Sequence, residues 1–254
     1  AILAIPFALW ALRNDRGARV RLDLLGAVMI APSVVLLVHA IVRGNDDGWG
    51  SFGVIAELVA GMALLTGFVA WQARTSAPLV PMRLFRDRSF TVTNIAGFGF
   101  SFGTFGAIFL LIQYMQVVQG ASPWEAAVRT TPWTLAPMVI APLAGLIAPR
   151  IGTRILMVVG LVMQATALIW LTAILDLDTQ YAAMIAPFVI AGVGMGLVFA
   201  PSATALLATL GIVDHAKASG VNSTVREIGL ALGTAVLTAI FLGAGGELIP
   251  DLYV

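Results

Sequence analysis

Two opposite charges, Arg226 and Glu227, stand side by side in the otherwise small and apolar stretch GVNSTVREIGLALGTAV (220–236). Consecutive helical residues point about 100° apart, so each charge needs a neighbour of its own: Asn222 lies one turn before Arg226, and Ser223 one turn before Glu227. A charge inside a membrane is costly and normally faces protein or water. Arg226 therefore either lines an internal cavity or braces a gate, or it anchors the helix by extending its guanidinium to the headgroups. The role of Glu227 stays open.

The composition indicates a membrane protein. Hydrophobic residues make up 59% of the chain, charged residues only 11%, and the mean hydropathy is +0.97, whereas a soluble domain carries about 25% charge. Cysteine is absent, which excludes disulfides and thiolate metal sites. The chain has no phosphate-binding G-x-x-x-x-G-K-[ST] motif, so ATP-driven transport within it is not expected. We expect no cofactor, no metal and no nucleic-acid partner.

Seven stretches are long and apolar enough to cross a bilayer, since a helical span needs roughly 20 residues. None has the alternating pattern of a membrane β-strand, so we expect an all-α polytopic bundle. A partial span at 1–12 precedes them, and the basic amphipathic connector 74–90 is expected at the membrane interface. The seven expected spans are 23–42, 52–73, 91–118, 125–148, 154–174, 181–208 and 218–243.

The positive charges alternate between connectors. Twelve of the fourteen Lys and Arg residues fall on one side of the expected bundle when Arg226 is counted with its nearer end. The positive-inside rule makes that side cytoplasmic, so the first complete span runs outward. The preference for Arg over Lys favours a GC-rich bacterium, and we expect a multi-pass protein of the bacterial cytoplasmic membrane. His39 and Glu57 then lie near outer helix ends, with roles that the sequence leaves open.

The short cytoplasmic connector GLIAPRIGTR (145–154) can be interpreted as a tight turn with two arginines. It also resembles the G-x-L-a-D-R-x-G-R-R signature of the major facilitator superfamily, where this loop couples neighbouring helices and helps to hold one conformation of the alternating-access cycle. Pro149 stands where that family often has an acid, so the resemblance does not extend to the charge relay made by the acid. The matching residues are Gly145, Arg150, Gly152 and Arg154.

Four further stretches resemble the 14-span drug:proton antiporters, the EmrB/QacA-type branch of that superfamily: 21–29, 77–90, 110–127 and 220–236. The resemblance implies a partial bundle containing the end of span 6 and spans 7–13 of 14. Residues 1–12 would end a preceding span. Residues 13–90 would hold two extra linker spans and the basic cytoplasmic amphipathic segment. Residues 91–254 would form a C-terminal bundle that lacks its last span, and the N-terminal half, with the proton-linked motifs, would be a missing partner.

Glycines and prolines mark contacts and bends between the spans. Small residues let helix backbones approach in a membrane, and we expect this of Gly99, Gly103, Gly106, Gly192 and Gly196. The stripe formed by Phe98, Phe102, Phe105 and Phe109 would face lipid, the core or a hydrophobic substrate. Prolines at 132, 137 and 142 predict either a gating bend or a static kink.

Candidates for the substrate cavity or gate come from the same C-terminal spans. Arg226 is carried over by the resemblance together with Gly229. Arg129, near an outer helix end, either extends to the headgroups or faces the cavity. The full candidate set is Arg226, Asn222, Gln113, Tyr114, Gln116, Arg129, Trp133 and Met138.

The resemblance implies proton-coupled efflux of lipophilic or cationic drugs across the membrane, by rocking of two helix bundles about a central site. The lipid bilayer, a small substrate and protons are the implied partners. A narrow-specificity exporter of a metabolite or antibiotic is the alternative within the same class. A membrane-embedded lipid-modifying enzyme is the alternative from another class, but the two His, the absent Cys and the lack of paired acids in the spans leave it without catalytic groups.

Overall fold

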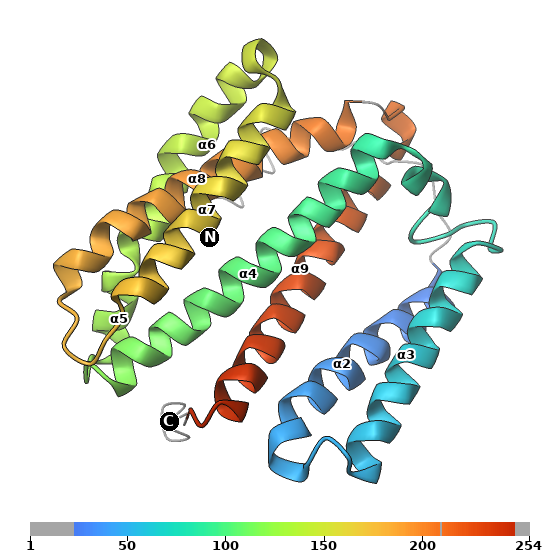
Figure 1. Ribbon diagram of the computed structural model, residues 1–254. Coiled ribbons are helices and arrows are strands. Elements are labelled where there is room, and N and C mark those ends of the chain that lie inside the picture. Colours follow the sequence, from blue (N-terminus) through green and yellow to red (C-terminus); the bar gives the residue numbers. More distant parts are fainter. Residues whose placement is uncertain (1–22, 209, 247–254) are drawn as a thin grey trace, which may run out of the picture.

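A computed structural model of the chain describes residues 23–208 and 210–246 (Figure 1). Within those residues the regular structure is helical throughout, and seven spans are long and apolar enough to cross a membrane. The expected all-α bundle with seven spans is confirmed. The expected partial span 1–12 and the basic residues up to 22 lie outside the described residues, as do residues 247–254. The elements are α2 (Leu24–Asp47), α3 (Phe52–Gln72), the short 3-10 helix η1 (Met82–Arg86), α4 (Arg88–Val117), α5 (Pro123–Arg129), α6 (Thr131–Ile151), α7 (Thr153–Ile174), α8 (Tyr181–Leu207) and α9 (Ile212–Gly243).

Two elements differ from the expected spans. The span expected at 125–148 is divided at Thr130 into α5 and α6, because Pro132 has no N–H to donate and opens a new helix as one of its first residues. Helix α9 begins at Ile212 rather than at 218. Its first turns carry Asp214 and Lys217, and these polar residues lower the hydropathy there without interrupting the helix.

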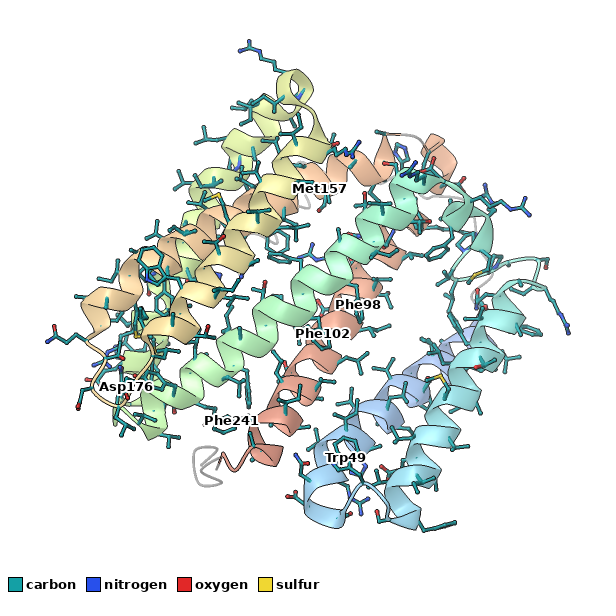
Figure 2. The ribbon with its side chains drawn as sticks, viewed as in Figure 1. Trp49, Phe98, Phe102, Met157, Asp176 and Phe241 are labelled. Carbon is teal, nitrogen blue, oxygen red and sulfur yellow. The ribbon has the colours of Figure 1, made fainter. Side chains whose placement is uncertain are left out.

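The connectors alternate between the two ends of the bundle (Figure 1). Those between α3 and α4, α6 and α7, and α8 and α9 lie at one end, and those between α2 and α3, α4 and α5, and α7 and α8 at the other. The first group carries most of the basic residues of the described chain, with Arg43 and Arg129 at the other end, and is cytoplasmic by the positive-inside rule. Figure 2 shows Trp49, Asp176 and Phe241 towards the opposite, outer end.

Helix pairs organise the bundle. Helix α4 packs along α9, α8 packs against both α6 and α7, and α2 packs against α3 and, on its other side, α9. A buried cluster holds the outer ends of α4, α7 and α8 together around Met115, Leu171, Met184 and Phe188. The indole of Trp133, fully buried, lies 5.8 Å from the Phe188 ring between their centroids, which joins α6 to this cluster.

Glycines of α9 set the contact with α4. A Cβ added at Gly229 would lie 2.7 Å from the Phe98 carbonyl oxygen, and one at Gly233 would overlap the Phe102 carbonyl oxygen. From the other side, a Cβ at Gly106 would lie 2.8 Å from the Gly233 carbonyl oxygen. The two backbones therefore touch directly along this seam, and Figure 2 shows Phe98 and Phe102 on the stretch of α4 that runs beside α9.

The expected packing glycines divide into two groups. A Cβ at Gly192 would lie 2.5 Å from the Trp133 carbonyl oxygen, and one at Gly196 would lie 2.7 Å from the Ile140 Cβ, so both face α6. Gly106 faces α9 as described. Gly99 and Gly103, in contrast, have open space where a Cβ would stand, because they lie on a side of α4 that no described helix covers closely.

Adding a side chain to the α4–α9 seam should destabilise the protein. We expect Gly233→Leu to lower stability by about 1–3 kcal/mol, because the new side chain must push the Phe102 backbone away. For a chain of this length that corresponds to a thermal midpoint lower by roughly 2–10 °C, which intrinsic fluorescence in detergent measures. Gly99→Leu is the matched control, since its Cβ meets open space. Equal midpoints for the two variants would contradict the seam.

Candidate functional site

Arg226 lies where α4, α8 and α9 meet. Its guanidinium carbon is 4.0 Å from the centroid of the Phe199 ring of α8, a close cation–π contact. Phe199 in turn packs edge-on against Phe100 of α4, with 5.5 Å between ring centroids. The side-chain stem of Arg226 passes Gly97 of α4, where an added Cβ would lie 3.4 Å from its Cγ. Three helices thus shape the space around one half-buried cation.

The expected span 218–243 would put Arg226 about 12 Å along its helix, and the structure places it deeper. Because α9 begins at Ile212, Arg226 lies about 21 Å along the axis, near the middle of the helix. Its guanidinium contacts an aromatic ring of the neighbouring helix. It forms no salt bridge with any residue that the structure describes. Glu227, one residue further, is exposed and also lacks a described salt bridge.

Asn222 is one turn before Arg226 and belongs to the same contact. Its side chain is buried, and Nδ2 donates to Oδ1 of Asn94 on α4 at 3.3 Å. Asn94, also buried, donates its own Nδ2 to the Phe90 carbonyl at 2.8 Å. This chain of amides links α9 to the inner part of α4, beside Arg226. Sequence reasoning named Asn222 and missed Asn94 and Phe199.

Several buried polar atoms of the bundle have no hydrogen-bond partner among the described residues. An unpaired polar group inside a protein is expensive, so such atoms mark positions able to bind a polar partner. Three belong to candidate residues: the side-chain oxygens of Gln113 and Gln116 on α4 and the indole N–H of Trp133. Both amide atoms of Gln164 on α7 are also unpartnered, and its side chain is 4% exposed. Gln164 was not singled out from the sequence; a glutamine in the middle of an apolar span is the signal that identifies it.

Arg129 and Tyr114 take part in a network at the outer end. Arg129 Nη1 donates to Gln119 Oε1 at 2.9 Å, and Gln119 Nε2 donates to the Thr179 carbonyl at 2.9 Å. The hydroxyl of Tyr181 donates to the Arg129 carbonyl at 3.1 Å, and that of Tyr114 donates to the Asp176 carbonyl. These bonds fasten the α4–α5 and α7–α8 connectors to each other. Met138 is 70% exposed on α6 and does not join them.

The cytoplasmic loop forms the turn between α6 and α7. Gly152 has φ +94°, a left-handed conformation that glycine adopts without strain, and its N–H donates to the Ala148 carbonyl at 2.9 Å. Arg150 and Arg154, on either side of the turn, are exposed, and Gly145 faces open space within α6. The loop residues thus stand at the inner surface, apart from the Arg226 contact.

Hydrogen bonds of the Glu57 carboxylate join α2 to α3 at the outer end of the pair. Glu57 of α3 accepts from Arg43 Nη1 at 3.1 Å and lies 2.9 Å from Nδ1 of His39. Arg43 also pairs with Asp47, one turn later on α2. The residues whose roles the sequence left open, His39 and Glu57, therefore bridge α2 to α3.

Asp23 joins three segments at the inner end of the same pair. Its Oδ1 accepts from the Gly26 N–H and from the Trp71 indole, both at 2.9 Å, and its Oδ2 accepts from Gln72 at 2.7 Å. Gln72 Oε1 in turn accepts from the Val80 N–H at 3.1 Å. The Gly26 N–H, with the Trp71 indole, holds the pKa of Asp23 below its usual value of 3.8, because these donors stabilise the ionised carboxylate.

The comparison with known proteins decides the family. Residues 1–234 match the family model of the Major Facilitator Superfamily. The chain belongs to this superfamily. Membership, together with the seven apolar helices, makes it a multi-pass membrane protein of the transporter class, and it removes the membrane-enzyme alternative.

Three bacterial relatives illustrate the similarity. The chain is 27% identical over 229 residues to the tetracenomycin C resistance and export protein of Streptomyces glaucescens, covering 90% of the chain and 42% of that protein. It is 28% identical over 252 residues to the multidrug transporter protein MdtP of Bacillus subtilis, covering 98% and 46%. It is 32% identical over 231 residues to the cephamycin export protein CmcT of Amycolatopsis lactamdurans, covering 90% and 47%. The chain thus spans less than half the length of each of these relatives. Its superfamily, its seven apolar helices and its bacterial relatives place it in the bacterial cytoplasmic membrane.

The Asp23 network predicts a pH-dependent stability difference. A depressed pKa means that the ionised carboxylate stabilises the fold at pH values above the usual pKa of 3.8, and that this contribution is lost as the pH falls through the native pKa. We expect Asp23→Asn to lower the thermal midpoint at about pH 7 and to approach the wild type at about pH 3.

Asp87→Asn is the matched control for this experiment. Asp87 also caps a helix, accepting from the Phe90 N–H at 2.8 Å, but it has no described side-chain donor comparable to Trp71 or Gln72. Its substitution should have the smaller effect. A deficit of Asp23→Asn that persists undiminished in acid would contradict the role of the ionised carboxylate.

Proposed function

We propose that the chain is the C-terminal part of a 14-span exporter of the EmrB/QacA type. It would move lipophilic or cationic compounds out of the cell in exchange for protons by alternating access. The observation that carries the proposal is the position of Arg226: a cation without a described acidic partner, near the middle of α9, at the meeting of three helices of a major facilitator bundle.

The role proposed for Arg226 is to brace α9 against α8. Its guanidinium is already engaged with the Phe199 ring at 4.0 Å, and a free positive charge would repel a cationic substrate. A cation–π contact in a desolvated place is worth up to about 2 kcal/mol, enough to bias one of two helix arrangements. Arg226 then acts on transport through the conformation of the helices, as a gate residue.

Substrate contact is assigned to the buried polar atoms that lack described partners. Gln113, Gln116, Trp133 and Gln164 offer amide and indole groups without a described hydrogen-bond partner inside the bundle, and such groups can bind a polar ligand. Proton coupling is assigned to the other half of the transporter, because the resemblance puts the proton-linked motifs in the first five spans. The N-terminal half is accordingly the proposed partner of this chain.

A narrow-specificity antibiotic exporter is the second candidate. Two of the relatives carry names that point to one compound or class each, tetracenomycin C and cephamycin, while a third is named a multidrug transporter. The two candidates differ in substrate range, so efflux of several unrelated dyes would favour the multidrug exporter.

The decisive experiment measures ethidium efflux from bacterial cells that express the complete transporter, with and without a protonophore. We expect protonophore-sensitive efflux that Arg226→Ala lowers about tenfold at equal protein level, since the cation–π contact with Phe199 and the packing of the side-chain stem beside Gly97 are lost together. Phe199→Leu keeps the cation but removes the ring, and the loss of about 1 kcal/mol should lower efflux roughly fivefold.

Glu227→Gln is the matched control, because Glu227 is the exposed neighbour of Arg226 on the same helix. It should export like the wild type. Efflux that survives Arg226→Ala would make Arg226 an anchor rather than a gate residue. Efflux insensitive to the protonophore would contradict proton coupling, and well-expressed protein without dye efflux would favour the narrow-specificity exporter.

A further inference from the structure

An apolar cavity lies outside the Arg226 contact. It has a volume of about 550 Å³ and stands between the α2–α3 pair, the connector that carries η1, and the first half of α9. Phe68 of α3, Phe85 of η1 and Val225 of α9 are among the side chains that enclose it. Its volume lies within the range of small-molecule sites, but its wall is almost entirely hydrocarbon and lacks the several polar groups that such sites usually offer.

The cavity spans the depth of the cytoplasmic leaflet. On α9 its wall extends from Lys217, near the basic end of the bundle, to Ile228. That distance is about 16 Å along the helix axis, close to half of the roughly 30 Å hydrocarbon core. The lined length is therefore comparable to that of one lipid chain, and its Lys217 end, called its mouth below, lies on the side of the basic connectors.

The mouth of the cavity is positively charged. Lys217 is the charged residue of its wall, and no salt bridge of Lys217 is found among the described residues. The nearest acid on α9, Asp214, is held by Arg83 of η1 through two hydrogen bonds, of 2.8 and 2.5 Å. Arg86 and Arg88 are exposed on the same connector. An anionic group at the mouth would meet Lys217 on a side of the bundle where Arg86, Asp87 and Arg88 together leave a net charge of +1.

The walls are fixed from both sides. The Asp23–Gln72–Val80 hydrogen bonds tie the connector to the ends of α2 and α3, and the Arg83–Asp214 pair ties it to α9. At Gly220, which lies in the wall, an added Cβ would meet nothing within 4 Å. The cavity is thus a preformed space with room next to the α9 backbone.

We propose that this cavity binds one acyl chain of an anionic phospholipid from the cytoplasmic leaflet, with the phosphate at Lys217. The hydrocarbon wall accepts the chain, the depth matches one leaflet, and the cationic mouth selects the charge of the headgroup. A hydrophobic cation fits the wall equally well, but Lys217 repels it. The bound lipid would fill the space between the α2–α3 pair and α9.

The test is native mass spectrometry of the purified complete transporter, titrated in detergent with phosphatidylglycerol or phosphatidylcholine of identical chains. We expect one phosphatidylglycerol to bind about fivefold more tightly than phosphatidylcholine, the difference made by roughly one basic residue at a membrane surface. Lys217→Gln should abolish this preference and Lys217→Arg should retain it. Gly220→Trp should lower the binding of both lipids by filling the cavity, and Gly220→Leu should do so to a lesser degree.

The controls use comparable residues on two other helices, α6 and α7. Gly145→Trp adds the same side chain at another open glycine near the cytoplasmic end, and Arg154→Gln removes another exposed cytoplasmic charge. Both should bind lipid like the wild type. Equal binding of the two lipids to the wild type, no effect of the Gly220 and Lys217 variants, or displacement of phosphatidylglycerol by ethidium would each overturn the proposal. Lipid binding is measured without transport, so its outcome is independent of the proposed export function.

Discussion

The direct backbone contact between α4 and α9 is the constraint on which the rest of the bundle depends. Apolar side chains gain little by leaving lipid for one another, so helices in a membrane associate through close packing. Gly106, Gly229 and Gly233 provide it by leaving no side chain between the two backbones. Arg226 lies one turn before Gly229, and the same close approach brings its stem against Gly97 and its guanidinium over Phe199. A wider seam would leave the cation without its aromatic neighbour.

Much of the fold could be predicted from the sequence, because a bilayer imposes simple rules on length, hydropathy and charge. The seven spans follow from these rules, and the superfamily follows from the loop at 145–154 and is confirmed by the family match. The 14-span branch stays a prediction. Hydropathy could not locate the start of α9, since a helix continues past the membrane wherever its backbone bonds are satisfied. It also could not locate the break at Thr130, which depends on Pro132 rather than on polarity.

Only the charged and polar residues of α9 that belong to the site could be predicted from the sequence. A charge in an apolar helix identified Arg226 and Asn222, but their partners Asn94 and Phe199 lie on helices whose pairing no local pattern encodes. The glycines of α4 could be predicted only in part for the same reason. Gly99, Gly103 and Gly106 lie on one stripe of the helix, but of these three only Gly106 faces a neighbouring backbone. Which side of a helix is covered depends on the neighbours, and the neighbours are set by the whole bundle.

The α2–α3 pair is fastened to α9 at both ends. At the outer end Asn45 donates to the Ala239 carbonyl at 2.6 Å, and at the inner end the connector reaches Asp214 through Arg83. In Figure 1 the pair stands to one side of the bundle, next to α9. A movement of α9 would therefore carry the α2–α3 pair with it.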